Sequence, residues 1–278
     1  MPQIRINYSD FMENELCLIK LGGSVITNTA VQKEAKPEVI KRLLKEIYEA
    51  KKETGADIII GHGGGSFPHI SASKYGVQNG LVNEESRKGA IITLSDAREL
   101  DSIFIKCGVE IGIPIFPFSP SSFTLSKKGK ISEGSVSQIR EAMARGFIPV
   151  VYGDVGVDAE QGVCIVSTEE ILNFLSRHFK PSKVIFGTDV DGVFDRNPAD
   201  PKAKLVGELN NKNISEIMST VGTTKKVDVT GGMKIKVSLM YEIVRSTGAI
   251  GYIANATKPG IMKSIILGRD EQCTVVKR

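Results

Sequence analysis

The chain has no tryptophan and only three histidines among its 278 residues, and aromatic side chains make up 6% of it. Side chains that could stack on nucleobases are therefore scarce. Basic residues exceed acidic ones by only four, 36 against 32, and they cluster in short pairs such as Lys127 and Lys128. Nucleic-acid-binding proteins usually concentrate a larger positive excess on one face. We expect no nucleic-acid partner.

Cysteine and long hydrophobic runs are also scarce. Four isolated cysteines form no CxxC pair, which argues against a zinc site and favours reduced, buried thiols in a cytoplasmic protein. No apolar run approaches the roughly 18 residues that span a bilayer, and residues 1–15 read as a polar extension without an apolar signal core. We expect a cytoplasmic protein without a membrane partner, and no metal ligands of its own.

Short apolar segments alternate with longer amphipathic ones along the rest of the chain. This pattern is typical of an α/β fold in which helices cover both faces of a mostly parallel, open sheet. The expected strands are Leu16–Leu21, Asp57–Gly61, Pro114–Phe116, Ile148–Tyr152, Lys183–Phe186, Ala249–Ala254 and Cys273–Val276. The expected helices are Pro37–Glu53, Glu84–Ile111, Val136–Arg145, Glu169–His178, Met233–Thr247 and Pro259–Leu267. Two hairpins are expected in Phe123–Ile131 and Gly153–Val166.

The segment IIIGHGGGSFPH, residues 58–69, is the most informative part of the sequence. An apolar strand enters a turn with three consecutive glycines, whose backbone N–H groups could approach an anion without obstruction by Cβ atoms. A helix starting at Ser66 would direct its positive end at the same point and would place His69 about one turn in. The alternative is an ordinary strand-to-helix turn with an incidental histidine.

Three further glycine-rich turns follow the same pattern. The first strand ends in KLGGS, residues 20–24, with Lys20 on the strand. A lysine in a buried strand is costly unless it is paired or binds a ligand. GTDVDGV, residues 187–193, also follows a strand, and DVTGGMKIK, residues 228–236, places lysines at the start of a helix, where an anion would stabilise them.

The standard nucleotide-binding and hydrolytic motifs are missing. The sequence contains no GxxxxGK[ST], the glycine turn lacks the last glycine of GxGxxG, and neither a Ser/His/Asp triad nor HExxH appears. Several glycine turns combined with lysines and one histidine suit two phosphate-bearing ligands that face each other. Phosphoryl transfer mainly requires positioning and positive charge, which this set supplies.

The motifs KLGGS, HGGGSFPH, YGD, TDVDGV and DVTGGMKIK, in this order, resemble those of the amino acid kinase superfamily. Within it, the histidine after HGGGSF, together with IPIFPFSPSSF and VVYGDV, is similar to the isopentenyl phosphate kinases, which are mostly archaeal. The resemblance implies a three-layer αβα sandwich and transfer of a phosphoryl group from ATP to isopentenyl phosphate, with Mg²⁺ as cofactor, in an alternative mevalonate route to isoprenoids. It also implies a homodimer of single-domain subunits, residues 16–278. The acceptor would bind to about residues 16–180 and ATP to about residues 181–278.

The resemblance also implies roles for individual residues. The catalytic groups would be Lys20, His69 and Lys236. The acceptor would contact Gly64, Ser66, His69 and Gly153. ATP would contact Lys20, Gly22, Gly23, Ser24, Gly65, Asp189, Gly232 and Lys236. Two lysines and a histidine would neutralise the phosphate charge.

The sequence departs from the family pattern at three places. Thr29 stands where the family usually has a second lysine, with Lys33 or Lys36 as alternative sources of that charge. Glu169 replaces the aspartate of an SGD motif, and Pro68 replaces a glycine beside the histidine. These departures keep open a nucleotide-binding protein of the same fold without turnover, and a fosfomycin-type kinase is the enzymatic alternative.

A pocket for the apolar part of the acceptor is expected on the long helix Glu84–Ile111. Its apolar face would carry Ala90, Ile91, Leu94 and Ala97, with Ile70 and Tyr75 nearby. Core packing is the alternative explanation for this face. An apolar pocket would favour isopentenyl phosphate, and a polar one fosfomycin.

Overall fold

The computed structural model describes residues 15–198, 200–220 and 232–278. Its described strands form a large sheet of eight, ordered β10-β12-β11-β9-β1-β2-β6-β3, and a small sheet of four, ordered β5-β4-β7-β8. All neighbours in the large sheet are parallel except β11 and β12. The expected α/β architecture with a mostly parallel open sheet is confirmed.

The strands of the large sheet are β1 (Leu16–Leu21), β2 (Asp57–His62), β3 (Ile115–Pro117), β6 (Ile148–Tyr152), β9 (Lys183–Thr188), β10 (Glu208–Leu209), β11 (Ile250–Asn255) and β12 (Thr274–Val276). Those of the small sheet are β4 (Thr124–Lys127), β5 (Lys130–Gly134), β7 (Asp154–Asp158) and β8 (Gly162–Val166). The two expected hairpins are present, and they pair with each other through β4 and β7. The pairing of the hairpins was not expected from the sequence, because it depends on contacts between distant segments.

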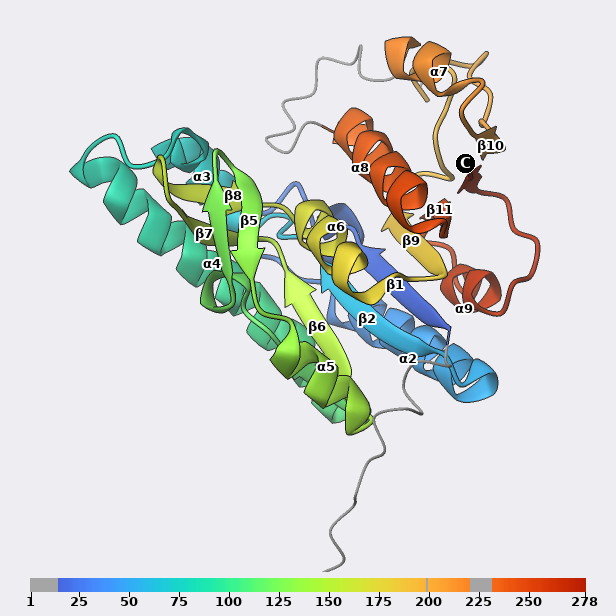
Figure 1. The fold of residues 1–278 in the computed structure, drawn as a ribbon, viewed down its shortest axis with the longest axis horizontal. Coiled ribbons are helices and arrows are strands. Elements are labelled where there is room, and N and C mark those ends of the chain that lie inside the picture. Colours follow the sequence, from blue (N-terminus) through green and yellow to red (C-terminus); the bar gives the residue numbers. More distant parts are fainter. Residues whose placement is uncertain (1–14, 199, 221–231) are drawn as a thin grey trace, which may run out of the picture.

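Helices cover both faces of the large sheet (Figure 1). One face packs against α1 (Gly23–Ile26), α2 (Pro37–Thr54), α4 (Glu84–Glu110) and α9 (Ile261–Ile266). The other face packs against α5 (Ser137–Ala144), α6 (Thr168–Phe179), α7 (Ile214–Thr220) and α8 (Gly232–Thr247). The helix α3 (Pro68–Tyr75) and the short 3₁₀ helices η2 (Val77–Asn79) and η3 (Pro120–Ser122) complete the described elements. Two buried hydrophobic clusters, one on each face, give the expected three layers.

Strand β1 lies in the middle of the large sheet, between β2 and β9. All six of its residues are buried, and five of them are apolar; the sixth is Lys20. The sheet is continuous across residue 180, because β9 pairs with both β1 and β11. The carboxyl ends of β1, β2, β6 and β9 therefore lie side by side, and in open α/β sheets such ends are where ligands bind.

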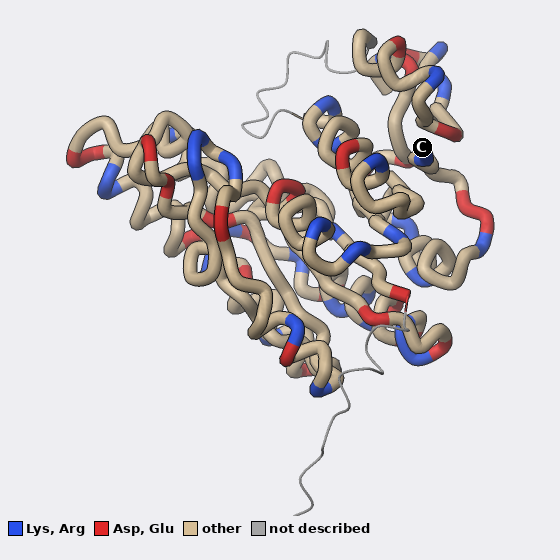
Figure 2. Tube along the Cα trace, viewed as in Figure 1, with Lys and Arg blue, Asp and Glu red and all other residues tan. Residues whose placement is uncertain are grey.

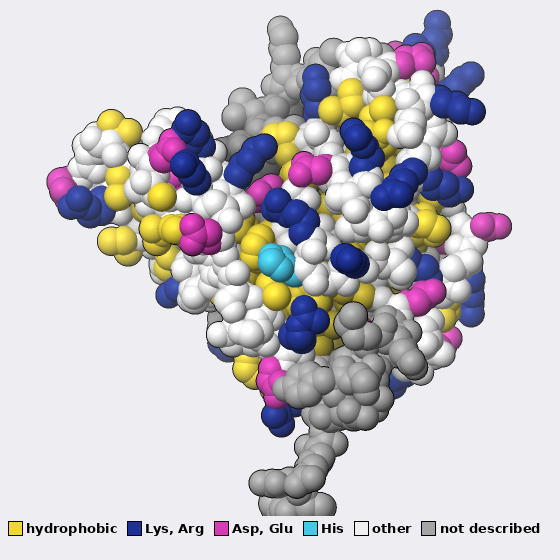
Figure 3. All heavy atoms as spheres, viewed as in Figure 1, with side chains coloured by type: hydrophobic (Ala, Val, Ile, Leu, Met, Phe, Trp, Pro, Cys, Tyr) yellow, Lys and Arg dark blue, Asp and Glu magenta, His cyan; other side chains and the backbone are white. Residues whose placement is uncertain are grey.

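All four cysteines are buried and unpaired, as expected. No helix within the described residues is long and apolar enough to cross a membrane. Basic and acidic residues are interleaved along the described chain (Figure 2), and the face in Figure 3 likewise mixes both signs of charge with hydrophobic side chains.

Candidate active site

A cavity of about 800 Å³ opens at the carboxyl ends of the central strands. It is lined by residues from β1, α3, α4 and α8, from the start of α6, and from the segments that follow β1, β2, β6 and β9. The residues expected from the sequence that line it are Lys20, Gly22, Gly23, Ser24, Gly64, Gly65, Ser66, His69, Gly153, Asp189 and Lys236. Gly232 is the one expected residue that does not line it; this glycine begins α8, which contributes Met233 and Lys236. The segment Asp228–Gly231 lies outside the described residues.

Lys20 is a buried, charged residue of the cavity wall. Only 4% of the residue is exposed, and its Nζ lies 3.2 Å from Oε1 of Glu169, in the first turn of α6. Burial alone would raise the pKa of Glu169, but the charges of Lys20 and then Lys236 hold that pKa below its ordinary value. A buried ammonium needs such a partner. Glu169, noted in the sequence only as a departure from the family pattern, therefore belongs to the site.

The two glycine turns after β1 and β2 are packed backbone against backbone. A Cβ atom on Gly23 would lie 2.3 Å from the backbone nitrogen of Gly65, and one on Gly63 would lie 2.7 Å from the nitrogen of Gly23. Gly65 also has a positive φ of 53°, and its Cβ would meet Oγ1 of Thr27 at 2.1 Å. Glycine is required here by the close approach of the two turns.

Two of the turn N–H groups expected to face an anion donate within the protein instead. Gly22 donates to the carbonyl of Gly187 at 2.8 Å, and Gly63 donates to that of Leu21 at 2.9 Å. Gly153 likewise donates to the carbonyl of His62 at 3.3 Å, which also accepts from Oγ1 of Thr168 at 2.8 Å. These hydrogen bonds connect the carboxyl ends of β1, β2, β6 and β9 with one another and with the start of α6.

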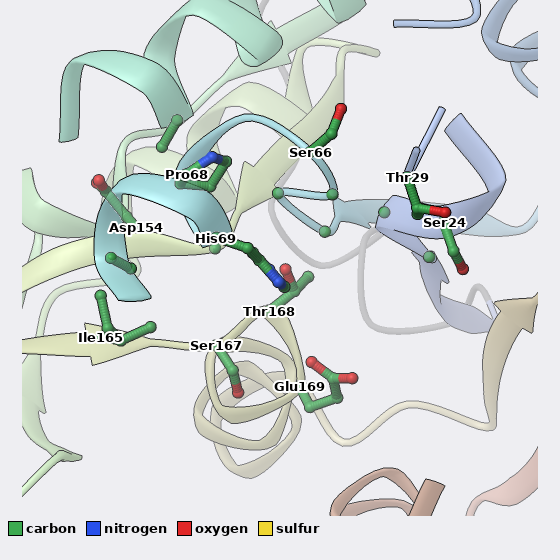
Figure 4. A pocket seen from close by; sticks show the side chains of 18 of the residues that line it. Ser24, Thr29, Ser66, Pro68, His69, Asp154, Ile165, Ser167, Thr168 and Glu169 are labelled. Atoms are coloured by element: carbon green, nitrogen blue, oxygen red, sulfur yellow. The ribbon is translucent and has the colours of Figure 1, made fainter. Parts of the chain in front are cut away.

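Helix α3 begins at Pro68, with Phe67 as its N-cap, two residues after the start at Ser66 that the sequence analysis considered. Proline suits the first position of a helix, because the missing N–H would have no partner within the helix. His69 is consequently the second helical residue, and its imidazole extends into the cavity toward the start of α6 (Figure 4). A Cβ on Gly64 would lie 2.2 Å from Cγ of Pro68, so the proline ring packs on the glycine turn.

Two buried hydroxyls of the cavity wall have no hydrogen-bond partner among the residues that the structure describes. These are Oγ of Ser66 in the glycine turn and Oγ1 of Thr93 on α4. Buried polar atoms are usually satisfied, and an unpaired one in a cavity wall fits a ligand that supplies the missing partner. Ser66 was expected to contact the acceptor, whereas Thr93 has no sequence signal beyond its place on the long helix.

The cavity wall also carries apolar side chains, from Ile70, Ala72, Ala97 and Ile165. Ile91, expected in this wall, is 66% exposed and lies outside the cavity, so that expectation was wrong. The residue falls on the solvent side of α4, because the helix buries only the stripe facing the protein.

Asp191 of the GTDVDGV turn does not line the cavity. Its Oδ1 accepts from Nδ2 of Asn255 at 2.9 Å and lies 2.7 Å from Nζ of Lys258. Hydrogen bonds from Lys258 and Asn255 lower the pKa of this carboxyl. Within the described residues, no group of three or more His, Cys, Asp or Glu could hold a metal ion.

Residues 15–255 match the model of the amino acid kinase family. The chain is 33% identical to an isopentenyl phosphate kinase of Methanothermobacter thermautotrophicus, covering 93% of this chain and 98% of that protein. An isopentenyl phosphate kinase of Arabidopsis thaliana is 31% identical, with 69% and 63% covered. A crystallised isopentenyl phosphate kinase superimposes with a TM-score of 0.80 at 30% identity, covering 94% of this chain and all of that one.

The chain belongs to the amino acid kinase family, and within it to the isopentenyl phosphate kinases. These relatives do not favour the fosfomycin-type kinase or the protein without turnover. A carbamate kinase of Giardia lamblia shares the fold at a TM-score of 0.67 but only 12% identity.

Proposed function

We propose that this protein transfers the γ-phosphoryl group of ATP to isopentenyl phosphate, producing isopentenyl diphosphate and ADP. The observation that carries the proposal is that Lys20, His69 and Lys236, from three distant segments, line one cavity together with the two glycine turns. An oxygen of the acceptor phosphate would form the new bond to the γ-phosphorus, and the bond from that phosphorus to the oxygen of ADP would break. The protein's contribution is position and positive charge.

The cationic side chains would divide this work. Lys20 lies at the carboxyl end of β1, directly before the first glycine turn, and would contact both the incoming and the transferred phosphate. Lys236, at the start of α8, would contact the γ-phosphate from the nucleotide side. His69 would donate an N–H to the acceptor phosphate, and Ser66 would gain there the partner that its buried Oγ lacks.

The two ligands would approach from opposite parts of the chain. The segment from about residue 16 to 180 supplies the glycine turns, α3 and the apolar side chains of the cavity wall, which suit an alkyl phosphate. The segment from about residue 181 to 278 supplies Asp189, Met233 and Lys236, which suit ATP. Mg²⁺ would be held mainly by phosphate oxygens of ATP and by water, as is usual for this ion in kinases.

The protein is further proposed to act as a cytoplasmic homodimer. Strand β3 forms the edge of the large sheet, and Phe116 on it is 43% exposed. Phe116 lies 5.2 Å from Phe118 and 5.4 Å from Phe147 between ring centroids, and Phe147 is 38% exposed. An exposed aromatic group on a sheet edge is suited to pairing with a second copy. Sedimentation of the wild type and of Phe116→Asp would test this.

The test of the reaction is an ADP-release assay with Mg-ATP and separate acceptors: isopentenyl phosphate, dimethylallyl phosphate, fosfomycin, carbamate and uridylate. The proposal predicts the highest kcat/KM with isopentenyl phosphate. A preference for fosfomycin would keep the phosphoryl chemistry but reject the apolar acceptor. ATP binding without turnover of any acceptor would reject the proposed reaction.

A further inference from the structure

The segment between α1 and α2 folds back on itself beside the cavity. Thr27 and Ala35 form an antiparallel bridge, and the N–H of Asn28 donates to the carbonyl of Glu34 at 2.8 Å. The N–H of Lys36 donates to the carbonyl of Ile26, also at 2.8 Å. These bonds close residues 27–36 into a loop, called the clasp loop below.

The clasp loop is joined to the second glycine turn at Ser66. The N–H of Lys33 donates to the carbonyl of Ser66 at 3.2 Å, and the N–H of Ser66 donates to Oγ1 of Thr27 at 3.1 Å. Thr29 of the same loop lines the cavity. The position of the clasp loop and the position of the glycine turn therefore depend on each other.

Lys33 has a backbone conformation that is unfavourable for a residue with a Cβ atom. Its φ is 58°, in the left-handed region. Lys128, with a similar φ, precedes Gly129 in a hairpin turn, and Lys180 is the C-cap of α6. At Lys33 the conformation occurs instead beside a ligand cavity, where surrounding contacts must hold it.

The side chain of Lys33 supplies such contacts. Its Nζ lies 2.7 Å from Oδ1 of Asp96 and 2.7 Å from Oε2 of Glu99, both on α4. Asp96 is a buried carboxylate, and it lies on the same helix as Thr93 and Ala97, which line the cavity. Hydrogen bonds to Asp96 and then Glu99 raise the pKa of Lys33, so the ammonium stays charged at neutral pH.

This arrangement also shows what the charge of Lys33 contacts. Lys33 was an alternative source for the charge that Thr29 lacks, but its ammonium is held on α4 and is not among the residues lining the cavity. Its charge joins the clasp loop to the helix instead.

We propose that Lys33 is a positioning residue for the acceptor phosphate. Its ion pairs with Asp96 and Glu99 fix the clasp loop between α4 and the glycine turn, and thereby hold Ser66 and Thr29 in the cavity wall. The inference rests on the proposed function, since it assigns the Ser66 side of the cavity to the acceptor. Misplacing a binding group by a fraction of an ångström weakens the ordering of the acceptor before transfer.

The test compares Lys33→Met with Lys41→Met. Lys41 is a matched control, because its Nζ also pairs with two carboxylates, Glu110 of α4 at 2.7 Å and Glu38 at 3.1 Å, but lies away from the cavity. Lys33→Met is expected to raise the KM for isopentenyl phosphate about tenfold, with a smaller change in the KM for ATP and in kcat. Lys33→Arg should largely restore the acceptor KM, and Lys41→Met should leave all three constants near wild type.

Hydrogen exchange of the clasp loop gives a readout that needs no turnover. Lys33→Met should speed amide exchange in residues 28–36, whereas Lys41→Met should not. Unchanged exchange and an unchanged acceptor KM in Lys33→Met would overturn the inference, as would an equal effect of Lys41→Met. An inactive wild type would instead reject the proposed function, and the exchange result would still decide whether Lys33 fixes the loop.

Discussion

Replacing Glu169 by glutamine removes the negative charge beside Lys20 while keeping nearly the same side-chain volume. The Nζ and Oε1 atoms of the pair are 3.2 Å apart, and 4% of Lys20 and 7% of Glu169 are exposed. At an effective dielectric constant of about 20, unit charges at this distance attract by ~5 kcal/mol. Removing one partner of a buried pair costs roughly 3–5 kcal/mol, because the other charge stays buried without compensation.

The glutamine keeps an oxygen that accepts a hydrogen bond, so we take the lower end, about 3 kcal/mol of unfolding free energy. For a chain of this size, that loss corresponds to a Tm lower by roughly 6–12 °C. Thermal unfolding followed by circular dichroism measures it. The control is Glu46→Gln, which removes an ion pair with Arg42 on α2, away from the cavity.

The pH dependence of the same pair has a defined sign. The pKa of Glu169 in the folded protein lies below its ordinary value of 4.5. Its contribution to stability is therefore fully present above about pH 4.5 and is lost as the pH falls through the folded pKa. The difference in Tm between the wild type and Glu169→Gln should shrink in that acidic range. A wild-type Tm of the variant at pH 7 would show that the charge of Glu169 does not stabilise the buried Lys20.

Three further substitutions test the site. His69→Ala should lower kcat/KM at least about tenfold, or ~1.4 kcal/mol. The control His178→Ala, at the exposed end of α6, should leave the steady-state kinetics unchanged. Equal kinetics of the two variants would show that His69 does not belong to the site. Gly65→Ala should lower the free energy of unfolding by more than about 1 kcal/mol. The reasons are the positive φ of Gly65 and the 2.1 Å distance between the added Cβ and Oγ1 of Thr27. Urea denaturation measures this loss, and an unchanged midpoint would contradict the prediction. Ala97→Leu should narrow the cavity and so reduce kcat/KM for isopentenyl phosphate. Ile91→Phe should leave kcat/KM unchanged, since Ile91 faces solvent. A larger loss of kcat/KM in Ile91→Phe than in Ala97→Leu would show that Ala97 is not part of the acceptor wall.

The sequence predicted the central strands well because they are buried on both faces. Leu16–Leu21 and Ile148–Tyr152 agree with β1 and β6 at both ends. A nearly unbroken apolar run is what such a strand requires. The turns at their carboxyl ends were also predicted, because glycine marks positions where the backbone must approach another group.

Contacts between distant segments could not be predicted in the same way. No local pattern shows that Gly23 packs on Gly65, or that Glu169 lies against Lys20. The pairing of the two hairpins into one small sheet has the same origin. Helix α3 begins at Pro68 rather than at Ser66, because proline suits the first position of a helix.

The structure brings all of the predicted site residues but Gly232 to one cavity. The fold explains this convergence, since parallel strands end at the same edge of the sheet. Residues of the wall such as Thr93 and Ile165 were missed, because small polar and apolar side chains on a helix or strand carry no motif.

The most direct test of the proposed reaction is ³¹P NMR of the protein with Mg-ATP and isopentenyl phosphate. We expect the monophosphate signal of the acceptor to disappear while the signals of isopentenyl diphosphate and of ADP appear in equal amounts. ADP with inorganic phosphate and an unchanged acceptor signal would show that the protein hydrolyses ATP and does not phosphorylate isopentenyl phosphate.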